Sequence, residues 1–137
     1  MKKEENERLN MIVRLLSTIS KQLERKPSLD IPPLWVRKAS LKHAKLPNWE
    51  HSYRILCDYY AIPHLFAKVD PKEVPVSGIA CYSSENRTIY SRDKIMTDKT
   101  GIHEFAHYLF DCLGIQYSRV SSEVMTEAYV EAFLEGV

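Results

Sequence analysis

The sequence is poor in glycine and cysteine, and it lacks long apolar runs. Its 137 residues include 4 Gly and 7 Pro, which excludes a collagen-like or low-complexity chain. No apolar run approaches the roughly 18 residues of a membrane span. The acidic residues and Arg14 near the N-terminus are unlike a secretory signal peptide. The three cysteines are scattered and odd in number, so we expect reduced thiols in a cytoplasmic protein.

The sequence also has no large excess of positive or negative charge. The chain has 19 Lys plus Arg and 18 Asp plus Glu, which gives a formal net charge of +1. This balance argues against a surface built mainly to bind nucleic acid phosphates. Apolar residues make up 45% of the chain, which is enough to bury a core at this size. We therefore expect a globular protein with neither a membrane nor a nucleic acid as partner.

The order of periodic segments predicts an α+β fold, with helices segregated against a small antiparallel sheet. Apolar residues at helical spacing predict an N-terminal helix that ends before Pro27. Asn48 and Thr97 (or Asp98) are expected N-caps, and Gly114 is expected to stop a helix. Helices are expected over about 4–25, 33–44, 48–61, 97–113 and 121–136, and strands within 64–70, 74–84 and 87–92, the last two as a hairpin.

The most informative segment is His103-Glu104-Phe105-Ala106-His107. Two His at i and i+4 of a helix lie on the same face, where one tetrahedral Zn²⁺ can bind both. The Glu beside the first His can reach a zinc-activated water and act as general base. The alternative is two ordinary His on an amphipathic helix. The apolar residues on the opposite face of this helix favour the zinc site.

A catalytic zinc takes three protein ligands, and no His follows His107. The last predicted helix carries a stripe of carboxylates at every fourth residue, formed by Glu123, Glu127, Glu131 and Glu135. We choose Glu127 as the third ligand because it lies in the middle of the stripe, 20 residues after His107. Its neighbour Ala128 is small and lets two helices approach. Glu123 is one turn away and stays open as the alternative.

These segments resemble the gluzincin metallopeptidases, in which HExxH is followed by a distant Glu. Residues 55–133 are similar to the ImmA/IrrE-type peptidase domain in four segments, and their compactness is similar to the minigluzincins. The segments are ILCDYYAIPHLF, GIACYSSENRTIYSR, TGIHEFAHYLFD and EAYVEAF. The resemblance implies zinc bound by His103, His107 and Glu127, with Glu104 as the base. In that family an Asp four residues after the distant Glu usually holds the first zinc-binding His, and here the longer Glu131 stands at that place beside His103.

The resemblance further implies a cytoplasmic zinc endopeptidase that acts on a peptide or protein substrate. Gluzincins often use a Tyr or His to stabilise the oxyanion, and we choose Tyr117, in the loop between the two site helices. Packing is the alternative role for it, as it is for the other candidates. These are Tyr108, Tyr129, His43, His51 and His64. The substrate is expected to lie along an exposed strand of the hairpin, 76–83 or 87–91.

The resemblance does not extend to residues 1–50, which are expected to form a helical extension of unknown role ahead of a minimal metallopeptidase domain at 51–137, with both parts in one compact unit. The apolar stripe of the first helix is expected to pack on the domain, or to pair two protomers as a homo-oligomer. An alternative function keeps the zinc site but acts by docking a regulatory protein, with little turnover. ImmA/IrrE-type proteins are tied to repressors, which supports this alternative. The intact Glu104 favours the enzyme, because a structural zinc site does not need it.

Overall fold

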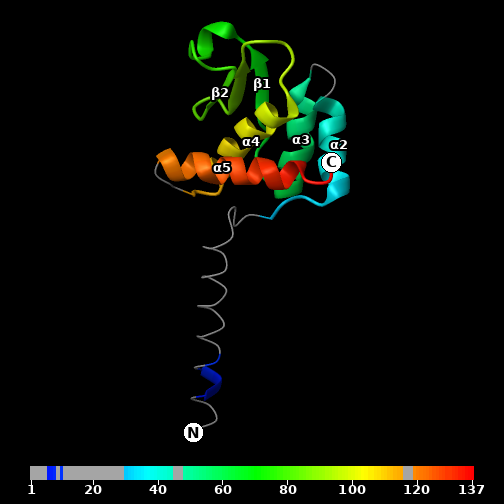
Figure 1. Ribbon diagram of the computed structural model, residues 1–137, viewed down its shortest axis with the longest axis vertical. Helices are drawn as coiled ribbons and strands as arrows, with labels where there is room; N and C mark the ends of the chain where they lie inside the picture. Colours follow the sequence, from blue (N-terminus) through cyan, green and yellow to red (C-terminus); the bar gives the residue numbers. More distant parts are fainter. Residues whose placement is uncertain (1–5, 9, 11–29, 45–47, 116–118) are drawn as a thin grey trace. The chain divides into compact units, whose positions relative to one another are not determined.

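The computed structural model describes residues 6–8, 10, 30–44, 48–115 and 119–137 (Figure 1). Contacts within the chain divide it into Met1–Asp30 and Ile31–Val137. In the first unit, residues 6–8 and 10 are helical, and most of the helix expected over 4–25 lies outside the described residues. The division falls 20 residues before the boundary suggested by the sequence. Residues 31–50 therefore belong to the same compact unit as the candidate site.

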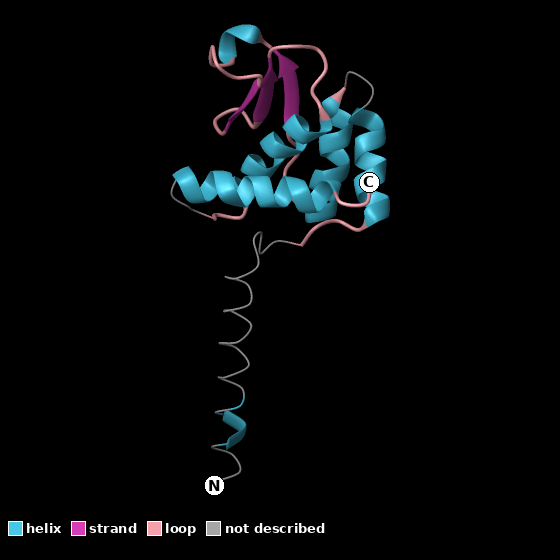
Figure 2. Cartoon of the chain, in the orientation of Figure 1, coloured by secondary structure: helices cyan, strands magenta, loops and turns pink. Residues whose placement is uncertain are grey.

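The second unit is an α+β fold, as the sequence predicts (Figure 2). Its helices are α2 (Leu34–Ala44), α3 (Trp49–Tyr60), α4 (Asp98–Cys112) and α5 (Arg119–Leu134). Its strands are β1 (Phe66–Val69), β2 (Ala80–Ser83) and β3 (Thr88–Ser91), with a short 3₁₀ helix, η1 (Pro71–Glu73), between β1 and β2.

The predicted capping residues fix where two of these helices begin. The Asn48 side chain accepts a hydrogen bond from the Glu50 amide at 3.2 Å, and that of Thr97 accepts one from the Thr100 amide at 3.2 Å. Both bonds satisfy amides that have no partner within the helix. Helix α4 ends at Cys112, and Gly114 follows with a φ of +67°, a conformation that favours glycine. The start and end of the site helix are thus set locally.

The three strands form one sheet in the order β1-β3-β2. β2 and β3 pair antiparallel as the predicted hairpin, but β1 pairs parallel with β3. The expectation of a wholly antiparallel sheet is therefore wrong. Residues 70–79, which include η1, carry the chain from β1 past the position of β3. The returning strand of the hairpin, rather than β2, consequently lies beside β1. This arrangement leaves β2 at one edge of the sheet.

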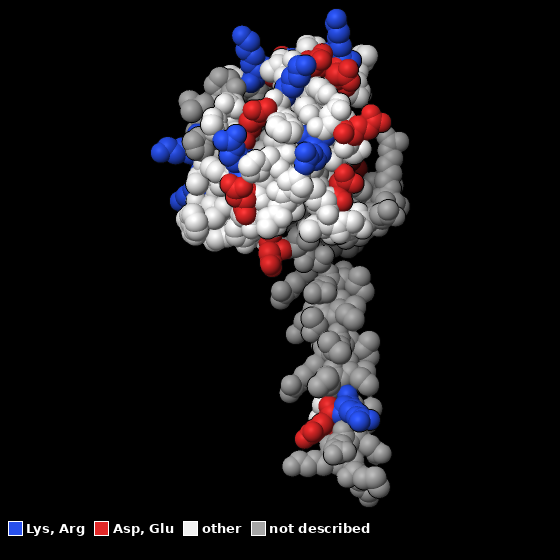
Figure 3. Space-filling view, turned by 180° about the vertical axis from the view of Figure 1, so that it is seen from behind, with Lys and Arg blue, Asp and Glu red and all other residues white. Residues whose placement is uncertain are grey.

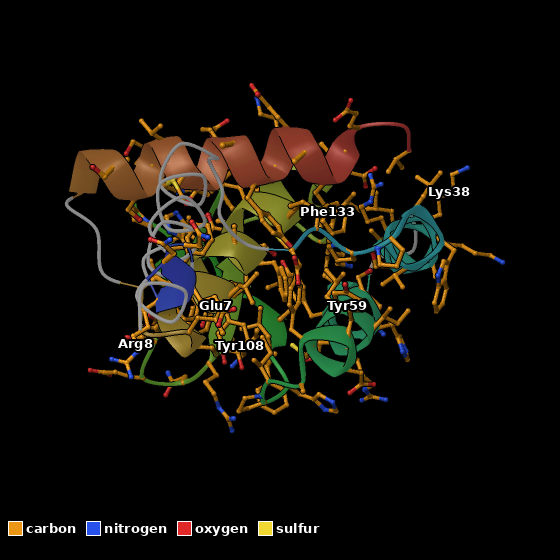
Figure 4. All side chains as sticks on the ribbon, turned by 90° about the horizontal axis from the view of Figure 1, so that it is seen from below. Glu7, Arg8, Lys38, Tyr59, Tyr108 and Phe133 are labelled. Atoms are coloured by element: carbon orange, nitrogen blue, oxygen red, sulfur yellow. The ribbon has the colours of Figure 1, made fainter. Side chains whose placement is uncertain are left out.

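Helix α4 lies at the centre of this unit, between β2 and α5 (Figure 1). Its predicted apolar face is fully buried at Ile102, Phe105 and Leu109. Figure 4 shows Phe133 of α5 turned toward the other helices, whereas Lys38 of α2 points outward. Helix α3 packs so closely on α4 that a Cβ at Gly101 would lie 2.2 Å from the Trp49 ring. Gly101 thus allows the close approach of α3 to α4.

One face of the molecule can be compared with the balanced composition. On the face shown in Figure 3, acidic and basic side chains are interspersed rather than gathered by sign. Within the described residues, no helix is long and apolar enough to cross a membrane.

Candidate metal centre

Helix α4 places the two imidazoles of the HEFAH segment side by side. His103 and His107 are one helical turn apart, and their Nε2 atoms are 3.2 Å apart. The ring centroids are 4.9 Å apart, with the planes at 76°. Their side chains keep 22% and 24% of their surface exposed, so both rings remain reachable from solvent. This part of the sequence prediction depended only on helix geometry, and the structure bears out the placement.

Helix α5 brings two glutamates of the predicted stripe to these rings, each at a different position. The Glu123 carboxylate lies 3.7 Å from Nε2 of His103 and 3.5 Å from Nε2 of His107. The Glu127 carboxylate instead lies 3.2 Å from Nδ1 of His103, on the other side of that ring. The structure therefore groups Glu123, rather than the chosen Glu127, with the two Nε2 atoms.

His103, His107 and Glu123 can offer three ligand atoms to one metal ion. These atoms all lie within 4.8 Å of one another. In a tetrahedral zinc site with bonds of about 2.0–2.1 Å, two ligand atoms are about 3.3–3.4 Å apart. The two Nε2 atoms are 3.2 Å apart, which is close to that value, and the two oxygens of Glu123 lie 3.5 Å and 3.7 Å from Nε2 of His107 and of His103, respectively. The donor set is also chemically suitable, since two imidazoles and one carboxylate match a common catalytic zinc site.

The Glu127 carboxylate lies beside Nδ1 of His103, where it can orient the ring. A carboxylate beside Nδ1 accepts the proton of that nitrogen and leaves Nε2 free as a ligand. The resemblance implies Glu127 and Glu131 as the ligand and the orienting acid, whereas the two glutamates beside the imidazoles are Glu123 and Glu127. Among the described residues, Glu131 forms no ion pair with either imidazole.

Glu104 lies beside this group but in a drier environment. It is 8% exposed and lines the same cleft as the imidazoles. Burial raises the pKa of the Glu104 carboxyl; the His103 ring lowers it and the Glu123 charge raises it further. Burial lowers the pKa of His107, and the neighbouring His103 lowers it too. A carboxylate with a raised pKa and an imidazole kept neutral suit a proton acceptor and a metal ligand, respectively.

The cleft over these residues has a volume of about 790 Å³. One side is formed by β2, and the floor is formed by α4. Two further cleft residues are Tyr82 of β2 and Asp111 of α4, whose side chains are hydrogen-bonded at 2.8 Å. The sequence offers Asp111 only as a poor rival to the glutamates as a zinc ligand, because it continues along the helix of the two His, and Asp111 is not part of the metal-binding group. The i+4 spacing from His107 to Asp111 is the feature of the sequence that places both residues on the same face of the helix. The sequence has no such feature for Tyr82, because its position depends on strand pairing.

The residues considered for stabilising the oxyanion lie in different environments where the structure describes them. Tyr117, the preferred choice, lies outside the described residues. Tyr108 is buried and donates to the Pro63 carbonyl, and Tyr129 is buried and bonded to the Tyr60 hydroxyl at 2.8 Å. His64 forms an exposed pair with Asp58 at 2.9 Å. Tyr108, Tyr129 and His64 thus already have partners away from the two imidazoles.

Comparison with known proteins gives no further guidance on this site. No protein-family model, curated protein or solved structure matches the chain.

Proposed function

We propose that this chain is a zinc-dependent endopeptidase of the cytoplasm that acts on a peptide or protein substrate. The observation that carries the proposal is the meeting of His103, His107 and Glu123 beside the buried Glu104, in one open cleft. A purely structural metal site needs neither a buried carboxylate of raised pKa nor an open cleft. Three reduced cysteines, Cys57, Cys81 and Cys112, fit a cytoplasmic protein.

Each residue of the metal centre has a distinct role in the proposed reaction. The two Nε2 atoms and the Glu123 carboxylate hold the zinc, while Glu127 fixes the ring of His103. Zinc, when bound, lowers the pKa of a water toward neutrality and polarises the substrate carbonyl. Glu104 accepts the proton released as the peptide carbonyl is attacked and then gives it to the leaving amine.

The sheet supports one path for the substrate. β3 is paired on both sides, so 87–91 cannot receive another strand. The β1 edge is partly covered, because its Ala67 amide donates to the Glu50 carboxylate at 3.2 Å. Among the described strands, β2 pairs with β3 alone, and Ala80, Cys81 and Tyr82 line the cleft. We therefore place an extended peptide along β2, where backbone hydrogen bonds can add it to the sheet.

The test compares the wild type with Glu104→Gln, which keeps the size of the side chain but removes the base. Zinc content by mass spectrometry should stay near one per chain, because Glu104 is not a ligand. Hydrolysis of a quenched peptide library should fall by at least about a hundredfold, the usual effect of losing a general base. Glu131→Gln, an exposed change on α5, is the matched control and should keep both properties.

Two results would contradict the proposal. Loss of zinc from Glu104→Gln would make this residue a ligand. A zinc-loaded wild type with no more hydrolysis than Glu104→Gln would favour the regulatory alternative, in which the site docks a partner with little turnover.

A further inference from the structure

The cleft continues past the metal centre to a carboxylate that the proposed chemistry does not use. Three acidic residues line the cleft: Glu104, Asp111 and Glu123. Glu104 and Glu123 have roles as base and ligand. Asp111 lies one turn beyond His107 on the same helix and is not part of the metal-binding group. Its presence in the cleft therefore needs another explanation.

The position of Asp111 is unfavourable for the helix itself. It lies in the last turn of α4, where the helix dipole disfavours a negative charge, and this turn has no basic residue. Among the described residues, no Lys or Arg forms an ion pair with it within 4.0 Å or lines the cleft. No cationic side chain of the described residues therefore compensates this charge, and it remains available to a ligand.

Tyr82 holds this charge in place. Its hydroxyl donates to Oδ2 of Asp111 at 2.8 Å, and its ring packs edge-on against Tyr108 at a centroid distance of 5.7 Å. Tyr108 is itself buried and bonded to the Pro63 carbonyl. Burial and the bond to Asp111 raise the pKa of Tyr82, so the phenol keeps its proton. Asp111 is therefore a fixed acceptor, and among the described residues no side chain is hydrogen-bonded or ion-paired to its Oδ1.

We propose that Asp111, held by Tyr82, is a specificity subsite for a cationic nitrogen group of the peptide substrate. This inference rests on the proposed peptidase function. One helical turn is about 5.4 Å, and an extended peptide advances about 3.3 Å per residue. The selected Lys or Arg side chain thus lies within about two residues of the scissile bond. A free peptide N-terminus carries the same chemistry, and the experiment separates the two.

The experiment measures binding, so that it does not depend on turnover. The full-length, zinc-loaded Glu104→Gln protein is titrated into fluorescent eight-residue peptides, followed by anisotropy. Three peptides are acetylated and differ only by Arg, Gln or Glu at the tested positions; a fourth has Gln and a free N-terminus. A charge-assisted hydrogen bond to Asp111 should make the Arg peptide bind about tenfold more tightly than the Gln peptide. If the N-terminal amine is the ligand, the fourth peptide binds best.

Variants assign any preference to Asp111. Asp111→Asn should abolish the Arg preference, and Asp111→Lys should reverse it in favour of Glu. Tyr82→Phe should reduce it, because the carboxylate loses its donor. Glu135→Gln removes the same charge from an exposed position outside the cleft and should leave the preference intact. Circular dichroism and Tm confirm that each variant is folded.

The outcomes separate the subsite from the function. If the peptides bind equally and Asp111→Asn changes nothing while the wild type cleaves peptides, the subsite is overturned and the peptidase stands. If no peptide binds and the wild type cleaves none, both proposals fail.

Discussion

The sharpest prediction concerns which glutamate of α5 binds zinc. Glu123→Gln replaces the carboxylate that lies 3.5–3.7 Å from the two Nε2 atoms with a neutral amide. Glu127→Gln keeps an oxygen that can accept the proton on Nδ1 of His103. The two substitutions are chemically identical and one helical turn apart, so their difference reports the ligand assignment alone.

The expected magnitudes differ enough to measure. The free energy of zinc binding is about 10–16 kcal/mol in structural sites, and about four ligands contribute to it. Loss of one ligand should therefore lower the zinc affinity by about a hundredfold or more. Losing an orienting partner such as Glu127 costs about 10–100-fold, and the conservative Gln should be near the lower end. At a free zinc concentration of 100 Kd, wild type gains about 2.7 kcal/mol of stability. At the same zinc concentration, the stability gained from zinc should be about 1.4 kcal/mol for Glu127→Gln and about 0.4 kcal/mol or less for Glu123→Gln.

The assay is thermal unfolding with and without zinc, supported by competition with a colorimetric chelator. At about 4 °C per kcal/mol for a domain of this size, zinc should raise the Tm by about 10 °C for wild type. The rise should be about 6 °C for Glu127→Gln and below about 2 °C for Glu123→Gln. Glu131→Gln should behave as wild type. If Glu127→Gln loses the response and Glu123→Gln keeps it, the ligand is Glu127 and our interpretation of the site geometry is refuted.

Two further predictions test the metal site and its support. The zinc-induced rise in Tm should shrink as pH falls below the ordinary histidine value of 6.5, because protons then compete for the imidazoles; the lowered pKa of His107 delays its protonation in the folded protein. A rise that is constant from about pH 7.5 to pH 5 would argue against imidazole ligands. Gly101→Ala should destabilise the protein by at least about 1–3 kcal/mol in urea, because its Cβ would meet the Trp49 ring at 2.2 Å. Unchanged stability would show that α3 and α4 are not packed this closely.

The sequence by itself determined the features that depend on neighbouring residues. The i, i+4 spacing of His103 and His107 puts both rings on one face of any helix that contains them. Asn48, Thr97 and Gly114 mark helix ends through their own side chains or φ values. The hairpin of β2 and β3 is also local, because a four-residue connection joins its strands.

Only the tertiary structure decided the contacts between distant segments. The glutamates of α5 repeat every turn, so spacing alone cannot tell which one meets the Nε2 atoms. The crossing of α5 over α4 selects Glu123 and leaves Glu127 at Nδ1 of His103. The parallel pairing of β1 with β3, and the meeting of Tyr82 with Asp111, likewise depend on where strands lie in the sheet. The physical reason is that helix crossing and strand order are set by packing of the whole core, which no local pattern encodes.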